Sequence, residues 1–141
     1  MSDLDEMYQD LVLEHSQNPR NFRIIDQPSC HAEGYNPACG DRVSVFLDIK
    51  DGIVADVSFQ GVGCAISTAS ASMMTEAVRG KSVAEAKKVA EDFCSTMTVD
   101  SHQPNQQIDD LSPLFGVKRF PVRVKCATLV WRALEQSLKG S

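Results

Sequence analysis

Three cysteines and one aspartate have the types and positions of a metal site. Cys39, Cys64 and Cys126 each stand where a predicted structural element begins, and Asp41 follows the first cysteine closely. Three thiolates and one carboxylate oxygen form a donor set that can hold zinc tightly while the sulfurs stay nucleophilic. The pattern therefore predicts a protein that handles sulfur.

The residues around these cysteines favour ionised thiols. Gly40 allows the backbone to come close to a ligand. Cys64 stands at the start of a predicted helix, where free N–H groups and the helix dipole favour the thiolate. Arg123 precedes Cys126 by one helical turn on the same face, so its cation can stabilise thiolates or an incoming anion.

A predicted hairpin brings two of the cysteines together. Apolar and polar residues alternate on both arms of the segment 42–60, as expected for two strands that each bury one face. A two-residue turn at Asp51-Gly52 would set each apolar row against a polar row. A three-residue turn at 50–52, with Gly52 in the left-handed conformation, aligns the apolar rows. This register pairs Val43 with Phe59 and Val45 with Val57, and it places Cys39 opposite residue 63.

The remaining elements follow from periodicity and capping signals. Helices are predicted from Asp3 to about residue 17, over 65–79, from the capping box at Ser82 to about Glu91, and from Pro121 onward. A short edge strand is predicted over 31–35. The polar, proline-bearing stretch 94–118 is interpreted as a surface excursion with one short turn at 108–111. These elements predict an α+β fold in which helices pack on one side of a small antiparallel sheet of about three strands.

Composition limits the function classes. The chain has 141 residues and a formal net charge of −5, which favours a single domain over 1–141 and disfavours nucleic-acid binding. We find no export signal and no apolar run of membrane-spanning length, so a cytoplasmic protein without structural disulfides is expected. The sequence contains neither a dinucleotide-binding glycine fingerprint nor the C-x2-C knuckles of structural zinc modules.

Other interpretations of single residues remain open. Each of the three cysteines taken alone is more typical of a small buried core residue, and it is their convergence that favours a site. Cys30 and Cys94 lie in segments without such convergence and are expected to be reduced thiols outside the site, with Cys30 and His31 as the candidates that could still reach it. His15, on the apolar stripe of the first helix, is expected to be a half-buried histidine with its hydrogen bonds satisfied.

Four motifs resemble the IscU-like family of iron-sulfur assembly proteins over nearly the whole length. Residues 15–21 are similar to its H-x-x-N-P-R-N signature, and residues 36–41, 61–67 and 125–126 are similar to its three cysteine motifs. Two features resemble the SufU-type branch: Lys125 replaces the histidine that scaffold members carry there, and residues at about 94–119 match a SufU-type insertion. The Leu-Pro-Pro-Val-Lys segment that chaperones recognise in scaffold members is missing from this sequence.

The resemblance implies an IscU/SufE-like fold with zinc bound by Cys39, Asp41, Cys64 and Cys126. It implies that the partner is a pyridoxal-phosphate-dependent cysteine desulfurase of SufS type, whose persulfide sulfur is accepted by Cys39 when the partner supplies a replacement ligand. Arg123 would then act on the incoming sulfur or contact the partner. The sulfur would pass to a downstream scaffold for iron-sulfur cluster assembly.

Three hypotheses follow. The first is a zinc-dependent sulfurtransferase acting with a desulfurase. The second is a non-enzymatic scaffold that assembles an iron-sulfur cluster on the same four ligands, which anaerobic reconstitution would reveal as a transferable chromophore. The third is a domain whose metal serves stability alone, which chelation would unfold.

Overall fold

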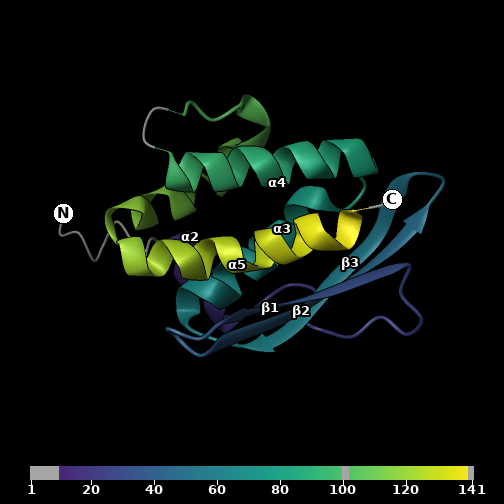
Figure 1. The fold of residues 1–141 in the computed structure, drawn as a ribbon, viewed down its shortest axis with the longest axis horizontal. Coiled ribbons are helices and arrows are strands. Elements are labelled where there is room, and N and C mark those ends of the chain that lie inside the picture. The colour runs from purple at the N-terminus through teal and green to yellow at the C-terminus, as the bar shows by residue number, and fades with distance from the viewer. Residues whose placement is uncertain (1–9, 100–101, 140–141) are drawn as a thin grey trace.

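The computed structural model describes residues 10–99 and 102–139, and it has the predicted α+β architecture (Figure 1). The sheet has the antiparallel order β1-β2-β3, with strands β1 (Cys30–Asn36), β2 (Asp41–Lys50) and β3 (Ile53–Val62). The helices are α2 (Asp10–Gln17), α3 (Ala65–Val78), α4 (Val83–Thr98), the 3-10 helix η1 (Gln106–Arg119) and α5 (Pro121–Leu138). Within the described part of the chain, no helix combines the length and apolarity that a bilayer span requires.

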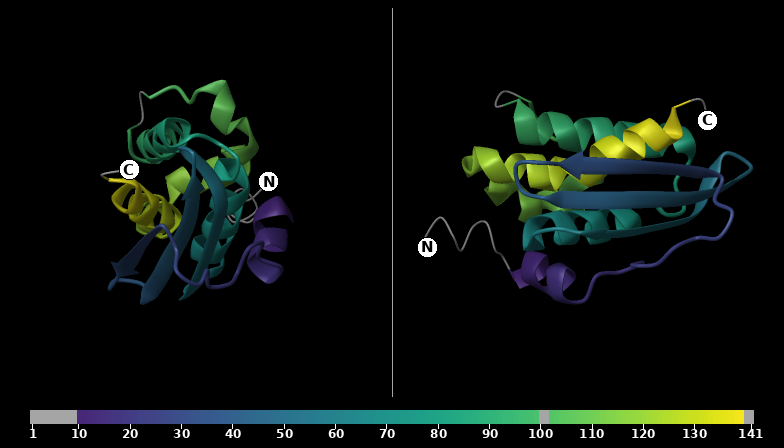
Figure 2. Two further views of the ribbon diagram at one scale, coloured as in Figure 1. Left: turned by 90° about the vertical axis from the view of Figure 1, so that its right-hand side faces the viewer. Right: turned by 60° about the horizontal axis from the view of Figure 1, so that its bottom comes forward.

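The helices form two tiers on one face of the sheet (Figure 2). Helix α5 contacts β1 and β2, helix α3 contacts β3, and α4 and η1 pack on these two helices farther from the sheet. Trp131 of α5 joins the tiers, since its indole Nε1 donates to Ser70 Oγ of α3 at 3.1 Å and its ring stacks on Phe93 of α4 at 4.9 Å. The small residues of α3 permit these close approaches, and most of that helix is buried.

The hairpin is present, but its predicted register is wrong. The turn is the two-residue one, with Lys50 paired with Ile53, and both turn residues have positive φ, 54° at Asp51 and 75° at Gly52. A bulge where the pairing passes from Ile49 to Asp48 then shifts the register by one residue, so that Val45 faces Phe59 and Val43 faces Gly61. One extra residue in one strand restores the match of apolar rows that a two-residue turn alone would break. The parity requirement was correct, and a bulge meets it.

The interpretation of residues 94–118 as a surface excursion is also wrong. Helix α4 continues to Thr98, and η1 occupies 106–119 with four buried apolar side chains. These side chains are Ile108, Leu111, Leu114 and Val117. Their spacing of three residues matches the three residues per turn of a 3-10 helix, which aligns positions i and i+3 on one face, and Ile108 lies at a kink with non-helical backbone angles. The segment is therefore part of the core.

The motif at 15–21 fixes the N-terminal segment on α3. His15 Nδ1 and the Arg20 backbone N–H both contact Ser72 Oγ, at 2.7 and 2.8 Å, and Asn21 Nδ2 donates to Thr75 Oγ1 at 2.9 Å. His15 is buried, and burial is the main cause that lowers its pKa. The motif thus has a structural role in this chain, while the part of the first predicted helix before Asp10 lies outside the described residues.

Candidate metal centre

The structure brings Cys39, Asp41 and Cys126 together at one end of the sheet. Cys39 lies in the loop between β1 and β2, Asp41 begins β2, and Cys126 lies in the second turn of α5. One ligand atom of each residue lies within 4.8 Å of the others, and the Sγ atoms of Cys39 and Cys126 are 3.5 Å apart. Segments far apart in sequence thus meet because α5 packs across β1 and β2.

Cys64 adjoins this group through its backbone, while its sulfur has another partner. Its N–H donates to Asp41 Oδ1 at 3.0 Å, and its Sγ caps α3 by accepting from the Ser67 N–H at 3.4 Å. The sulfur is not within the group formed by Cys39, Asp41 and Cys126. The predicted helix N-terminal position of Cys64 is therefore confirmed, and the cap contact holds its sulfur on the helix end.

One oxygen of Asp41, Oδ2, has no hydrogen-bond partner among the residues that the structure describes. Asp41 is fully buried, and its other oxygen, Oδ1, accepts from Cys64. Gly63 makes this approach possible, since a Cβ there would lie 2.8 Å from Asp41 Oδ1. A buried carboxylate oxygen without a partner is costly. A cation beside the two thiols would remove that cost, so the residues fit a zinc ion.

The charges around Cys126 also favour a cation. Burial first, then the neighbouring Asp41 carboxylate, Cys39 and Cys64, raise the pKa of the Cys126 thiol, and the hydrogen bond from Arg123 lowers it. Arg123 Nη1 donates to Cys126 Sγ at 3.9 Å, and this contact and the nearby cysteines raise the pKa of Arg123. Arg123 therefore faces the thiols as its spacing predicts, with Cys126 as its hydrogen-bond acceptor and Cys64 and Cys39 near enough to act on its charge.

The candidate ligand residues differ in their exposure to solvent. Asp41 and Cys126 are fully buried, whereas Cys39 and Cys64 are half-buried. A reagent arriving from outside therefore reaches Cys39 or Cys64 before Cys126. None of the five cysteines, all of which lie in the described ranges, forms a disulfide.

The other cysteines lie elsewhere. Cys30 pairs with Leu47 at the opposite end of β1 and His31 stacks on Phe46, so neither reaches the cluster. Cys94 is buried in α4, and burial raises its pKa to about 12, which makes it an inert core thiol.

Sequence reasoning missed Asn36, a buried residue that contacts both the Cys39 loop and Cys126. The available signal was its position directly before Pro37, where an asparagine side chain commonly accepts from the backbone two residues on. It also missed the need for glycine at position 63, directly before Cys64, the residue that caps the N-terminus of α3.

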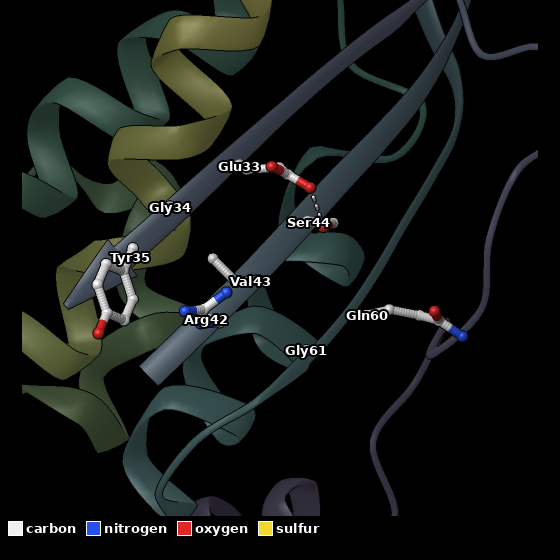
Figure 3. Close-up of a pocket in the computed structure, with 8 residues that line it drawn as sticks. All are labelled: Glu33, Gly34, Tyr35, Arg42, Val43, Ser44, Gln60 and Gly61. Carbon is white, nitrogen blue, oxygen red and sulfur yellow. Dashed lines mark hydrogen bonds between the residues drawn. The ribbon is translucent and has the colours of Figure 1, made fainter. Parts of the chain in front are cut away.

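A separate hollow of about 300 Å³ lies on the open face of the sheet (Figure 3). Its polar lining includes Arg42, whose guanidinium lies 4.7 Å from the Tyr35 ring centroid, and Glu33, which accepts from Ser44 at 3.2 Å. None of the described residues that line this hollow is a cysteine. The chemistry-bearing residues therefore gather at the end of the sheet and not on its open face.

Comparison with known proteins gives a consistent picture. Residues 7–139 match the family model described as the NifU-like N terminal domain. The chain is 39% identical to the zinc-dependent sulfurtransferase SufU of Bacillus subtilis, with 97% of this chain and 92% of that protein covered. It is 37% identical to the iron-sulfur cluster assembly scaffold protein IscU of Streptococcus pyogenes, covering 100% of this chain and 88% of that protein.

A solved structure is similar throughout. An iron-sulfur cluster assembly scaffold protein for the SUF system from Fervidobacterium islandicum superposes with a TM-score of 0.89 at 30% identity, covering 95% of this chain and 98% of the other.

Proposed function

Since the chain belongs to the NifU-like N-terminal domain family, we propose that it serves iron-sulfur cluster assembly by accepting persulfide sulfur at Cys39. The donor is a pyridoxal-phosphate-dependent cysteine desulfurase of SufS type, and the sulfur passes on to a downstream assembly scaffold. The observation that carries the proposal is the contact between Cys39 and Cys126 beside the unpartnered Asp41 Oδ2.

The proposed metal ligands are Cys39, Asp41, Cys64 and Cys126. Three of these already lie within 4.8 Å of one another, and Cys64 joins them when its sulfur leaves the Ser67 N–H. Zinc bound there would stabilise ionised thiols and, having no redox chemistry, would add no electron transfer of its own. The choice of zinc is supported by the relative from Bacillus subtilis, which is named zinc-dependent.

The transfer step itself is a thiol exchange. The Cys39 thiolate attacks the outer sulfur of the donor persulfide, a new S–S bond forms, and the S–S bond within the donor breaks. The donor cysteine leaves as a thiolate and takes up a proton from water, so no external oxidant or reductant is needed. The half-buried position of Cys39 gives the persulfide access, and the Arg123 guanidinium attracts its negative charge.

Stimulation of a SufS-type desulfurase tests the acceptor assignment. Alanine formation from cysteine is measured with wild-type protein, with Cys39→Ala, and with Cys30→Ala as a control at the opposite end of β1. Cys39→Ala should abolish stimulation and Cys30→Ala should retain it, and mass spectrometry should find one added sulfur atom on Cys39. Unchanged stimulation by Cys39→Ala would refute the assignment.

A scaffold function at the same residues is the second candidate, favoured by the scaffold relative from Streptococcus pyogenes. Anaerobic incubation with iron and sulfide separates the two. A scaffold yields a stoichiometric cluster chromophore that moves to an acceptor protein, whereas a zinc sulfurtransferase stays colourless and keeps its metal.

A further inference from the structure

A single residue, Asn36, binds every backbone N–H of the loop that carries Cys39. The loop comprises residues 37–40, and its first residue, Pro37, has no N–H. Asn36 Oδ1 accepts from the Ala38 N–H at 3.3 Å, and the Asn36 carbonyl accepts from Cys39 and Gly40 at 3.3 and 2.9 Å. Because all the backbone N–H groups of the loop donate to Asn36, the position of Cys39 depends on that residue.

The same side chain connects the loop to helix α5. Asn36 Nδ2 donates to Cys126 Sγ at 4.0 Å, and the residue is only 7% exposed. Arg123 supplies a second N–H donor to Cys126. The Cys39 sulfur, by contrast, has Cys126 as its only hydrogen-bond partner among the residues that the structure describes. The two adjacent thiols therefore differ in their donors as well as in their exposure.

An N–H donor draws electron density from the sulfur that it reaches, so a sulfur with two such donors is a weaker nucleophile than a sulfur with none. We propose that Asn36 is a positioning residue that makes Cys126 the retained, less reactive thiol of the site and presents Cys39 as the thiol that is released to accept sulfur. The inference rests on the proposed function and deepens it, since it states how the chain selects between two sulfurs 3.5 Å apart.

Two substitutions separate the loop contacts from the contact with Cys126. In Asn36→Ser the hydroxyl can still accept from Ala38 but is too short to reach Cys126. In Asn36→Asp the shape and the acceptor remain, and the N–H donor is replaced by a negative charge. Asn105→Ser is the matched control, because Asn105 Oδ1 accepts from the Gln107 N–H at 3.3 Å in the same way at the start of η1.

The zinc-loaded proteins are treated with limiting iodoacetamide, and alkylation of Cys39 and Cys126 is quantified by peptide mass spectrometry. Zinc release to a chromophoric chelator is followed in parallel. Wild type and Asn105→Ser should be alkylated mainly at Cys39. Both Asn36 variants should raise the share of Cys126 and accelerate zinc release by about tenfold, the scale seen when a group that supports a metal ligand is removed.

The outcomes distinguish this inference from the proposed function. Wild-type alkylation that favours Cys126 overturns the inference without any variant. An unchanged alkylation ratio and release rate in Asn36→Ser, with circular dichroism like that of wild type, overturns it as well. If the wild-type protein binds no stoichiometric zinc, the proposed function fails instead, because metal content is measured before the alkylation begins.

Discussion

Asp41 and Asp56 lie on adjacent strands of one hairpin and have opposite surroundings. Asp56 forms ion pairs with Arg23 and Arg79. The hydrogen bond from Arg23 is the main cause that lowers the pKa of Asp56 to about 2, and the one from Arg79 adds to it. Asp41 is fully buried beside thiols and keeps an oxygen without a partner. Asp56 pairs with arginines of the same chain and therefore stabilises the fold. Asp41 is buried without such a partner, and this indicates that it binds a cation from solution.

Removal of zinc should produce the largest difference between the two regions. At free zinc 1,000-fold above its dissociation constant, bound metal adds about 4 kcal/mol to the free energy of unfolding. A chelator should therefore lower the unfolding temperature markedly while the helical circular dichroism persists, since Trp131, Phe93 and Ser70 hold the helices together away from the site. Loss of all secondary structure on chelation would instead favour a purely structural metal.

The substitution Asp41→Asn should have the next largest effect. It keeps an oxygen for the Cys64 N–H but removes the charge, and zinc affinity should fall by more than about 100-fold, beyond what loss of a supporting group causes. The metal-free variant should be at least as stable as wild type, because a buried carboxylate without a partner is lost. Competition with a chelator and urea unfolding measure the two quantities.

Asp56→Asn is the matched control for that experiment. It should leave zinc affinity unchanged, and a fall comparable to that of Asp41→Asn would show that the two regions do not differ as described.

Gly63→Ala tests whether the close approach of Asp41 matters. The new Cβ would lie 2.8 Å from Asp41 Oδ1 and 3.0 Å from Ser67 Oγ, so the carboxylate must move. Zinc affinity should decrease by about tenfold. Gly80→Ala is the control, since Gly80 has φ +85° and open space around it. That variant should lose stability through backbone strain and keep its zinc affinity. Equal zinc affinity in both variants would contradict the steric argument.

The smallest effect is expected at Asp56. Its pKa is lower in the folded protein, so its contribution to stability is present above pH 4 and is lost as the pH falls toward 2. Asp56 is partly exposed, and solvent screening limits this contribution to about 1 kcal/mol. Urea unfolding of metal-free wild type and Asp56→Asn should show a gap at pH 7 that closes between pH 4 and pH 2. A gap independent of pH would exclude the charge as its cause.

Local patterns predicted most of the elements. The strand alternation, the capping box at Ser82 and the proline at position 121 each act over a few residues, and the structure has the corresponding hairpin and helices. Residues 108–117 were misread because their buried apolar residues recur every three positions, a period that matches neither an α-helix nor a strand.

The candidate site was predictable in composition and only partly in geometry. Cys39, Asp41 and Cys126 do converge. The predicted register gave the wrong reason for placing Cys39 near Cys64, because the bulge beyond Ile49 changes which residues face each other. No sequence pattern predicts that the Cys64 sulfur accepts a hydrogen bond from the Ser67 N–H, because a cysteine at the start of a helix can either cap that helix or bind a metal.

The amino-acid sequence by itself determined which residues could bind a soft metal and which faces of the strands and helices are apolar, because donor chemistry and periodicity are properties of the chain alone. The tertiary structure decided that Cys126 meets Cys39, that Asp41 keeps an unpartnered oxygen, and that Asn36 lies between loop and helix. These contacts depend on how α5 packs across β1 and β2, and such packing is set by the whole core and not by any local segment.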